Sequence, residues 1–232
     1  EILDSKRFIT CHSYVQSEIN MLMHVADSMG FKVNTFTHIL EGYKVADKMK
    51  AHGVGGSTFS DWWAYKYEVN DAIPYNAALM SSQGVTVAIN SDDAEMGRRL
   101  NQEAAKSVKY GGLSQEEAWK LVTLNPAKLL HLDDEMGSIK VGKDADLVLW
   151  TDNPLSILAK VQKTMIEGHL YYDADQNDVL ADRNRMERAR IIQKMALDNT
   201  SGNPMRQYQH SKERFFHCDS HGEEGETKTN LH

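Results

Sequence analysis

Residues 84–93 read GVTVAINSDD, and this stretch decides the fold class. Val85, Val87 and Ile89 alternate with smaller or polar residues, which is typical of a β-strand. The strand ends in two acidic residues, Asp92 and Asp93. An apolar strand that follows a helix and ends in polar side chains favours a parallel βα protein.

The sequence on the N-terminal side of this stretch repeats the same pattern. The predicted strands are RFITCH at 7–12, FKVNTFTH at 31–38 and a weaker VGGST at 54–58. The predicted helices between them cover residues 15–29, 43–53 and 74–84. Strands and helices that alternate in units of about 20–30 residues predict a parallel sheet.

The sequence on the C-terminal side changes character twice. Helices are predicted at 99–110, at 114–123 behind a Ser114–Glu117 capping box, and from Asn125, with Pro126 as first helical residue. Strands follow at 146–151 and 163–173, and then a charged helix at 182–197 and a polar tail. We therefore predict three regions, 1–136, 137–173 and 174–232.

The composition excludes some classes of protein. The 232 residues carry a formal net charge of −7, which argues against a general nucleic-acid binder. Two cysteines do not imply a disulfide framework. The chain contains no apolar run of about 18 residues, so we expect no membrane span and a soluble protein. We see no signal peptide, and the compartment stays open, export included.

Three potential metal ligands end three of the predicted strands. His12, His38 and Asp92 come at the carboxyl ends, where the active site of a parallel βα barrel lies. Imidazole and carboxylate are ligands that zinc accepts. The alternatives are a hydrogen-bonding role for each histidine and a turn or N-cap role for the aspartate. Asp93 is interpreted as a capping residue, with metal binding as its alternative role.

Residues 123–154, TLNPAKLLHLDDEMGSIKVGKDADLVLWTDNP, carry a more specific motif. They combine a T-x-N-P-A helix start with a G-S-I-x-x-G-K-x-A-D-L turn and strand, and MIEGHLYY follows at 165–172. This pattern resembles the amidohydrolase superfamily, in particular the branch with imidazolonepropionase, related cyclic-amide hydrolases and dipeptidases. The resemblance covers about residues 7–173. It implies an α/β fold, namely the C-terminal half of a TIM-type (β/α)8 barrel plus part of a small β-sandwich and a helical, polar tail.

The resemblance also implies roles for the three residues. His12 matches the metal-binding histidine after the fifth barrel strand. His38 matches the histidine after the sixth, which binds a second metal or holds the attacking water or substrate oxygen. Asp92 matches the ligand and proton shuttle after the eighth. The implied cofactor is one or two divalent ions, zinc above all, and the implied reaction is attack of metal-bound hydroxide on a cyclic amide or dipeptide-like C–N bond.

One departure from the family pattern leads to a prediction about partners. The family's H-x-H pair after the first strand and its Lys or Glu after the fourth have no counterpart before the tail. We therefore expect the chain to act with an N-terminal half, as a separate or a cleaved polypeptide, in an oligomer. The start EILDSKRFIT leads us to expect a fragment, a processed protein or a natural subunit. A non-catalytic subunit, or an interaction protein that uses residues 182–197 and the tail, is the alternative.

Other polar residues have weaker functional interpretations. Ser57 and the loop residues Asp61, Trp62 and Trp63 are expected to line the substrate pocket, with a packed surface loop as the alternative. His24 is expected to be a packing or surface residue, and His52 to complement a helix end. In the tail, His210, His217, Cys218 and His221 have metal-ligand spacing, against the alternative of a flexible polar segment.

Overall fold

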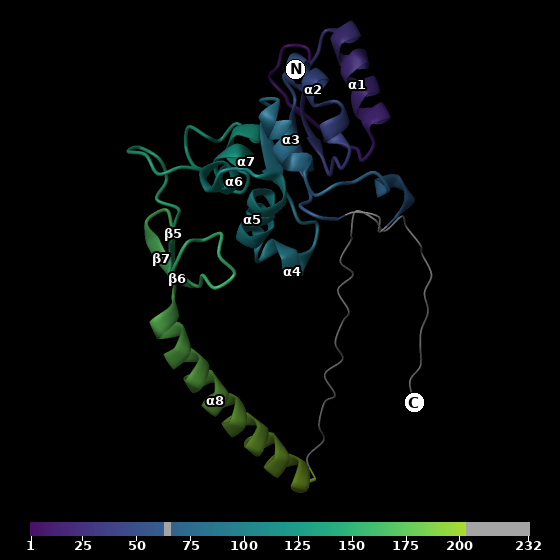
Figure 1. Ribbon diagram of the computed structural model, residues 1–232. Coiled ribbons are helices and arrows are strands. Elements are labelled where there is room, and N and C mark those ends of the chain that lie inside the picture. The colour runs from purple at the N-terminus through teal and green to yellow at the C-terminus, as the bar shows by residue number, and fades with distance from the viewer. Residues whose placement is uncertain (63–65, 203–232) are drawn as a thin grey trace. The chain divides into compact units, whose positions relative to one another are not determined.

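The computed structural model describes residues 1–62 and 66–202 (Figure 1). The chain divides into two compact units, Glu1–Ala174 and Asp175–His232. The first unit holds a parallel sheet, an antiparallel sheet and the helices α1 to α7. The predicted mixed α/β fold is confirmed at this level.

The parallel sheet contains β1 (Ile9–His12), β2 (Val33–Thr37), β3 (Gly55–Thr58) and β4 (Val87–Ile89), in the order β1-β2-β3-β4. The sequence predicts all four strands, and each observed strand is shorter than the range predicted for it. The register pairs His12 with Thr37 and Thr58 with Ile89. The carboxyl ends of the strands therefore meet at one edge of the sheet.

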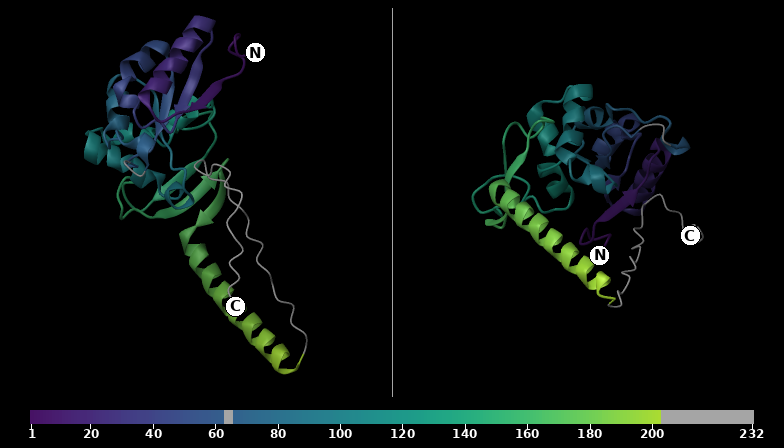
Figure 2. Two further views of the ribbon diagram at one scale, coloured as in Figure 1. Left: turned by 90° about the vertical axis from the view of Figure 1, so that its right-hand side faces the viewer. Right: turned by 90° about the horizontal axis from the view of Figure 1, so that it is seen from below.

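The helices that connect these strands are α1 (Gln16–Met29), α2 (Ala46–His52) and α3 (Asn76–Ser82). Short 3-10 turns occupy η1 (Gly42–Lys44) and η2 (Tyr67–Val69). The helix predicted at 43–53 therefore divides into η1 and α2. The three helices lie on one side of the parallel sheet (Figure 2).

The core lies between these helices and the sheet. Ile19, Met23 and Met49 from the helices pack with Phe36 and Val87 from the strands, and all five are buried. Burial of each such side chain stabilises the fold by about 1.5–3 kcal/mol. On the edge strand β1, Thr10 and His12 stay exposed. The core between the helices and the sheet therefore holds the strands in place, while His12 at the end of β1 stays accessible to solvent.

Four more helices follow β4: α4 (Ala94–Gly97), α5 (Leu100–Gly111), α6 (Gln115–Lys120) and α7 (Leu124–Leu129). The sequence did not predict α4, which Asp93 caps by accepting hydrogen bonds from the backbone N–H groups of Glu95 and Met96, both at 2.9 Å. The interpretation of Asp93 as a cap is confirmed. Ser114 caps α6 as expected, because its hydroxyl accepts the Glu117 N–H at 3.1 Å.

The predicted cap of α7 is wrong. The helix begins at Leu124 with Thr123 in the capping position, and Asn125 lies inside its first turn. The amide of Asn125 instead donates to the carbonyl oxygen of Val87 at 2.8 Å. This residue therefore ties α7 to β4.

The antiparallel sheet contains β5 (Leu147–Trp150), β6 (Val161–Ile166) and β7 (His169–Asp173). The single strand predicted at 163–173 is wrong, because Glu167 and Gly168 form a two-residue hairpin turn with φ of 50° and 77°. Positive φ at both positions matches the twist of hairpin strands. The sequence E-G gave no recognised turn signal.

The second unit is described through α8 (Ala174–Thr200), which contains the predicted charged helix. None of its side chains is buried, and Glu187 pairs with Arg190 one turn on at 2.7 Å. No helix in the described ranges is both long enough and apolar enough to cross a membrane. Trp63 and the four tail residues His210, His217, Cys218 and His221 lie outside the described residues.

Candidate functional site

His12 and His38 lie side by side at the carboxyl edge of the parallel sheet. His12 is the last residue of β1, and His38 directly follows β2. Because His12 pairs in register with Thr37, the two imidazoles come from neighbouring positions on adjacent strands. Their ring centroids are 4.8 Å apart, with an interplanar angle of 82°. The structure thus brings together two of the three predicted ligands.

The backbone takes an unusual conformation at two of the predicted ligands. His38 has φ of 61° and Asp92 has φ of 50°, in the left-handed region that favours glycine. Such conformations cost about 1–3 kcal/mol each and cluster at functional sites. Both residues therefore make a sharp turn where their strands end.

Asp92 lies at the opposite outer strand of the sheet from His12. It follows β4, whereas His12 ends β1, and these are the two outer strands of the four. At about 4.8 Å per strand, three steps amount to about 14 Å along the sheet. Within residues 1–62 and 66–202, no three His, Cys, Asp or Glu side chains are grouped so that they could hold a metal ion.

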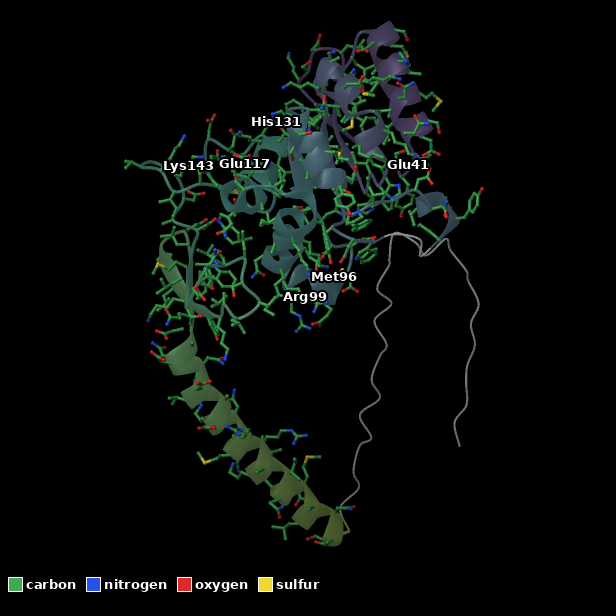
Figure 3. The ribbon with its side chains drawn as sticks, in the orientation of Figure 1. Glu41, Met96, Arg99, Glu117, His131 and Lys143 are labelled. Carbon is green, nitrogen blue, oxygen red and sulfur yellow. The ribbon has the colours of Figure 1, made fainter. Side chains whose placement is uncertain are left out.

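Aromatic rings flank the two histidines. Phe59 lies 4.9 Å from the His38 ring between centroids, and Trp62 stacks on Phe59 at 4.5 Å and 12°. The indole N–H of Trp62 donates to the sulfur of Met96 at 2.9 Å. Met96 belongs to α4 and is labelled in Figure 3. The loop that was expected to contribute Trp62 therefore places an aromatic wall beside His38.

Two expected substrate-binding residues already have partners within the chain. Ser57, in β3, donates its hydroxyl hydrogen to the side-chain oxygen of Asn90 at 2.9 Å. Asp61 pairs with the ammonium of Lys106 at 2.9 Å. Asn90 was missed in the sequence, although a polar residue between an apolar strand and Asp92 was a usable signal.

A buried ionic cluster fixes this loop to α5. The carboxylate of Glu103, which is 3% exposed, accepts the Ser60 hydroxyl and pairs with Lys106 at 2.9 Å. Burial alone would lower the pKa of Lys106, but its hydrogen bonds to Asp61 and Glu103 outweigh burial and raise that pKa. Nothing in the sequence distinguished Glu103 and Lys106 from ordinary helix-surface charges.

His24 and His52, for which the sequence predicts no metal-binding role, lie away from this site. His24 is exposed on α1. His52 is buried, with Nδ1 2.8 Å from a carboxylate oxygen of Asp27, and its Nε2 accepts the backbone N–H of Val33 at 3.2 Å. These bonds join α1, α2 and β2, so His52 has a structural position.

A comparison with known families places the chain. The model described as Amidohydrolase family matches residues 23–171, more than half of the chain. Amidohydrolase tasK of Hapsidospora irregularis is 27% identical over 170 residues, which are 71% of this chain and 17% of that protein. Imidazolonepropionase of Thermoplasma volcanium is 28% identical over 165 residues, 68% of this chain and 40% of that enzyme.

Among solved structures, the chain resembles an amidohydrolase from Thermotoga maritima. The TM-score is 0.69 at 27% sequence identity, over 74% of this chain and 45% of that one. The chain thus spans less than half the length of each of these three relatives. Proteins of this family generally use divalent metals, and the donor types of His12, His38 and Asp92 fit such an ion. The chain belongs to the amidohydrolase family, in the branch related to imidazolonepropionase.

Proposed function

We propose that this chain forms the strands five to eight of an amidohydrolase barrel and that, together with an N-terminal half, it hydrolyses a C–N bond. The substrate is a cyclic amide or a dipeptide-like molecule. The observation that carries the proposal is the His12–His38 pair, with 4.8 Å between ring centroids, at the carboxyl ends of adjacent parallel strands. In a parallel barrel this edge carries the active site.

His12, His38 and Asp92 are the residues of this chain that would hold a divalent ion, for which zinc is our proposal. A bound ion of this kind supplies a Lewis acid that polarises a carbonyl and lowers the pKa of water. The remaining ligands would come from the N-terminal half. In support, His12 and His38 adjoin, whereas Asp92 follows the outer strand farthest from β1, so these three residues alone do not form a compact ligand set.

The other residues of the site act on the substrate and on protons. A carboxylate oxygen of Asp92 accepts the proton of the attacking water and returns it to the leaving nitrogen. Phe59 and Trp62 form an apolar wall that packs against the substrate and excludes bulk water beside His38. Ser57 and Asp61 contribute through Asn90 and Lys106, which hold them in place.

Two features of the first unit support a missing half. The outer strands β1 and β4 each pair with only one neighbour in the described part of the chain, so each leaves one edge unpaired. The antiparallel sheet also exposes large apolar side chains, with Val148 at 45%, Leu149 at 52% and Tyr171 at 71%. Val148 and Leu149 are adjacent in β5, so the exposed apolar side chains lie on both faces of this sheet. N-terminal strands that complete the barrel and a small β-sandwich would cover both features.

The test is metal analysis and native mass of the chain purified with its N-terminal half, followed by assays on cyclic amides and dipeptides. We expect a complex of both halves with one or two equivalents of zinc and hydrolytic activity. His12→Ala and His38→Ala should each lose metal, whereas His24→Ala, on the exposed face of α1, should retain it. A complex without metal would overturn the proposal and indicate a non-catalytic subunit. Activity confined to dipeptides would identify a dipeptidase.

A further inference from the structure

A pocket lies at the opposite end of the parallel strands from the two histidines. Its volume is about 210 Å³, and Asn34, Lys50, Gly55, Gly84, Lys128 and His131 contribute to its lining. Asn34 stands near the start of β2 and Gly55 begins β3. Because the strands are parallel and His12 and His38 mark their ends, this pocket is separate from the proposed catalytic site.

The lining of the pocket is positively charged. Lys50 and Lys128 both contribute to it, and none of its lining residues is an aspartate or a glutamate. This contrasts with the whole chain, which has 33 acidic and 26 basic residues. Neither lysine forms a salt bridge or a side-chain hydrogen bond with any residue of the ranges 1–62 and 66–202. Two lysines thus line one concave site that contains no carboxylate, and neither has an ion-pair partner within the described ranges.

Side-chain hydrogen bonds fix the part of the pocket that holds Lys128. The Asn34 amide nitrogen donates to the carbonyl oxygen of Leu129 at 2.8 Å, and its oxygen lies 2.6 Å from Nε2 of His131. Phe8 stacks on the His131 ring at 3.7 Å between centroids. His131, which is labelled in Figure 3 and follows α7 in the chain, also turns the backbone with φ of 58°. Lys128 therefore stands on a segment that β2 holds in place.

Gly55 and Gly84 allow the side chains of Leu129 and Lys50 to pack directly against the backbone at the pocket. A Cβ added at Gly55 would lie 2.1 Å from a methyl carbon of Leu129, so only glycine lets Leu129 cover the start of β3. A Cβ added at Gly84 would lie 3.3 Å from Cε of Lys50, which shows that the Lys50 side chain extends across Gly84. Gly84 has φ of 81°, a conformation suited to glycine. The fold itself thus brings both lysines to the pocket.

We propose that this pocket binds a small phosphate anion, either free or as the phosphoryl group of a small molecule. Lysine ammonium groups bind phosphate as point charges. A pocket of about 210 Å³ has room for a phosphate group with a small substituent. The absence of carboxylates from its lining disfavours a cation. The site is independent of the proposed hydrolytic reaction, since it uses none of the residues assigned to it.

The experiment is calorimetric titration of the full chain with inorganic phosphate and, separately, with methyl phosphate, at constant ionic strength. We expect saturable binding at one site per chain, weakened at least tenfold in the double variant Lys50→Gln/Lys128→Gln. Lys48→Gln and Lys109→Gln, which remove lysines outside the pocket, should bind like the original chain. Tighter binding of methyl phosphate would identify a phosphorylated small molecule as the ligand, and tighter binding of inorganic phosphate would identify the free ion.

Two results would overturn the proposal. One is the lack of saturable binding of both anions by the full chain. The other is equal binding by the double variant and by Lys48→Gln. Circular dichroism checks that the variants are folded, and both lysines are exposed, so their replacement leaves the core intact. Neither result depends on metal content or hydrolysis, so failure here would be distinguishable from failure of the proposed function.

Discussion

The side-chain amide of Asn125 donates a hydrogen bond to the carbonyl oxygen of Val87 at 2.8 Å. This bond joins the first turn of α7 to β4, the strand that leads to Asp92. It gives the T-x-N-P-A motif a physical role, because Asn125 completes the hydrogen bonding of a buried strand residue. Helix α7 is thereby fixed to β4, the strand that precedes the proposed metal ligand Asp92.

Asn125→Ala should therefore destabilise the first unit. A buried carbonyl group left without its donor costs about 1–3 kcal/mol. Urea unfolding monitored by circular dichroism would measure the change, with the exposed substitution Lys48→Ala as control, for which we expect a change within about 0.5 kcal/mol. Equal stability of Asn125→Ala and the control would show that the bond is dispensable.

Glu103→Gln tests the buried ionic cluster that contacts Ser60 and Asp61. The change keeps a side chain of similar shape but removes the charge that Lys106 pairs with at 2.9 Å. Hydrogen bonds to charged groups contribute about 1.5–3 kcal/mol, and we expect a loss of stability in this range. Because Ser60 and Asp61 depend on the same cluster, the assembled enzyme should also show a higher KM.

The matched control for this variant is Glu117→Gln, on the surface of α6. Glu117 also pairs with a lysine, Lys120, at 2.7 Å, but its side chain is 55% exposed against 4% for Glu103. Exposed pairs contribute at most about 1 kcal/mol. Similar losses of stability in the two variants would argue against a special role of the buried cluster.

The ion pair between Lys44 and Asp71 predicts a pH dependence. The hydrogen bond from Lys44, at 2.5 Å, lowers the pKa of the Asp71 carboxyl, and the charge of Lys44 adds to this effect. A group with a lowered folded-state pKa contributes stability above its unfolded pKa of about 3.9, and this stability is lost as the pH falls through the folded value.

The stability difference between the original chain and Asp71→Asn should thus be constant at neutral pH and shrink below about pH 4. Urea titrations at a series of pH values would measure this difference. Asp134→Asn is the control, because Asp134 is exposed and has no ion pair within the described part of the chain. A difference for Asp71→Asn that stays the same down to pH 3 would contradict the assignment.

The sequence predicted the parallel sheet and the meeting of two histidines well, for a simple reason. Val87 and Ile89 alternate along β4, and His12 and His38 end neighbouring strands, so local pattern and parallel topology were enough. Asp92 follows β4, which is separated from β1 by two strands, and the structure groups no three potential metal ligands within residues 1–62 and 66–202. A local pattern identifies residues at strand ends, but it does not give the separation between the two outer strands of a sheet.

The errors have local and long-range causes. Asn125 before a proline looks like a helix cap, but its partner is 38 residues away, on another element. Glu167 adopts a positive φ that its residue type does not indicate, so the sequence predicts one strand where the structure has a hairpin. Glu103 is a common helix-surface residue type, and only tertiary packing buries it.

Trp62→Ala tests the aromatic wall beside His38. Trp62 stacks on Phe59, with 4.5 Å between centroids and 12° between planes, and Phe59 lies 4.9 Å from His38. Aromatic pairs contribute about 0.5–1.5 kcal/mol beyond area burial, which corresponds to roughly 2- to 10-fold in binding. In the proposed function the wall packs against the substrate without touching the reacting atoms, so KM of the assembled enzyme should rise while kcat changes little. Trp62→Phe keeps the stacking but loses the N–H contact with Met96 at 2.9 Å, so it should recover most of the affinity. Steady-state kinetics of both variants separates the two contributions, and an unchanged KM for Trp62→Ala would remove Trp62 from the substrate pocket.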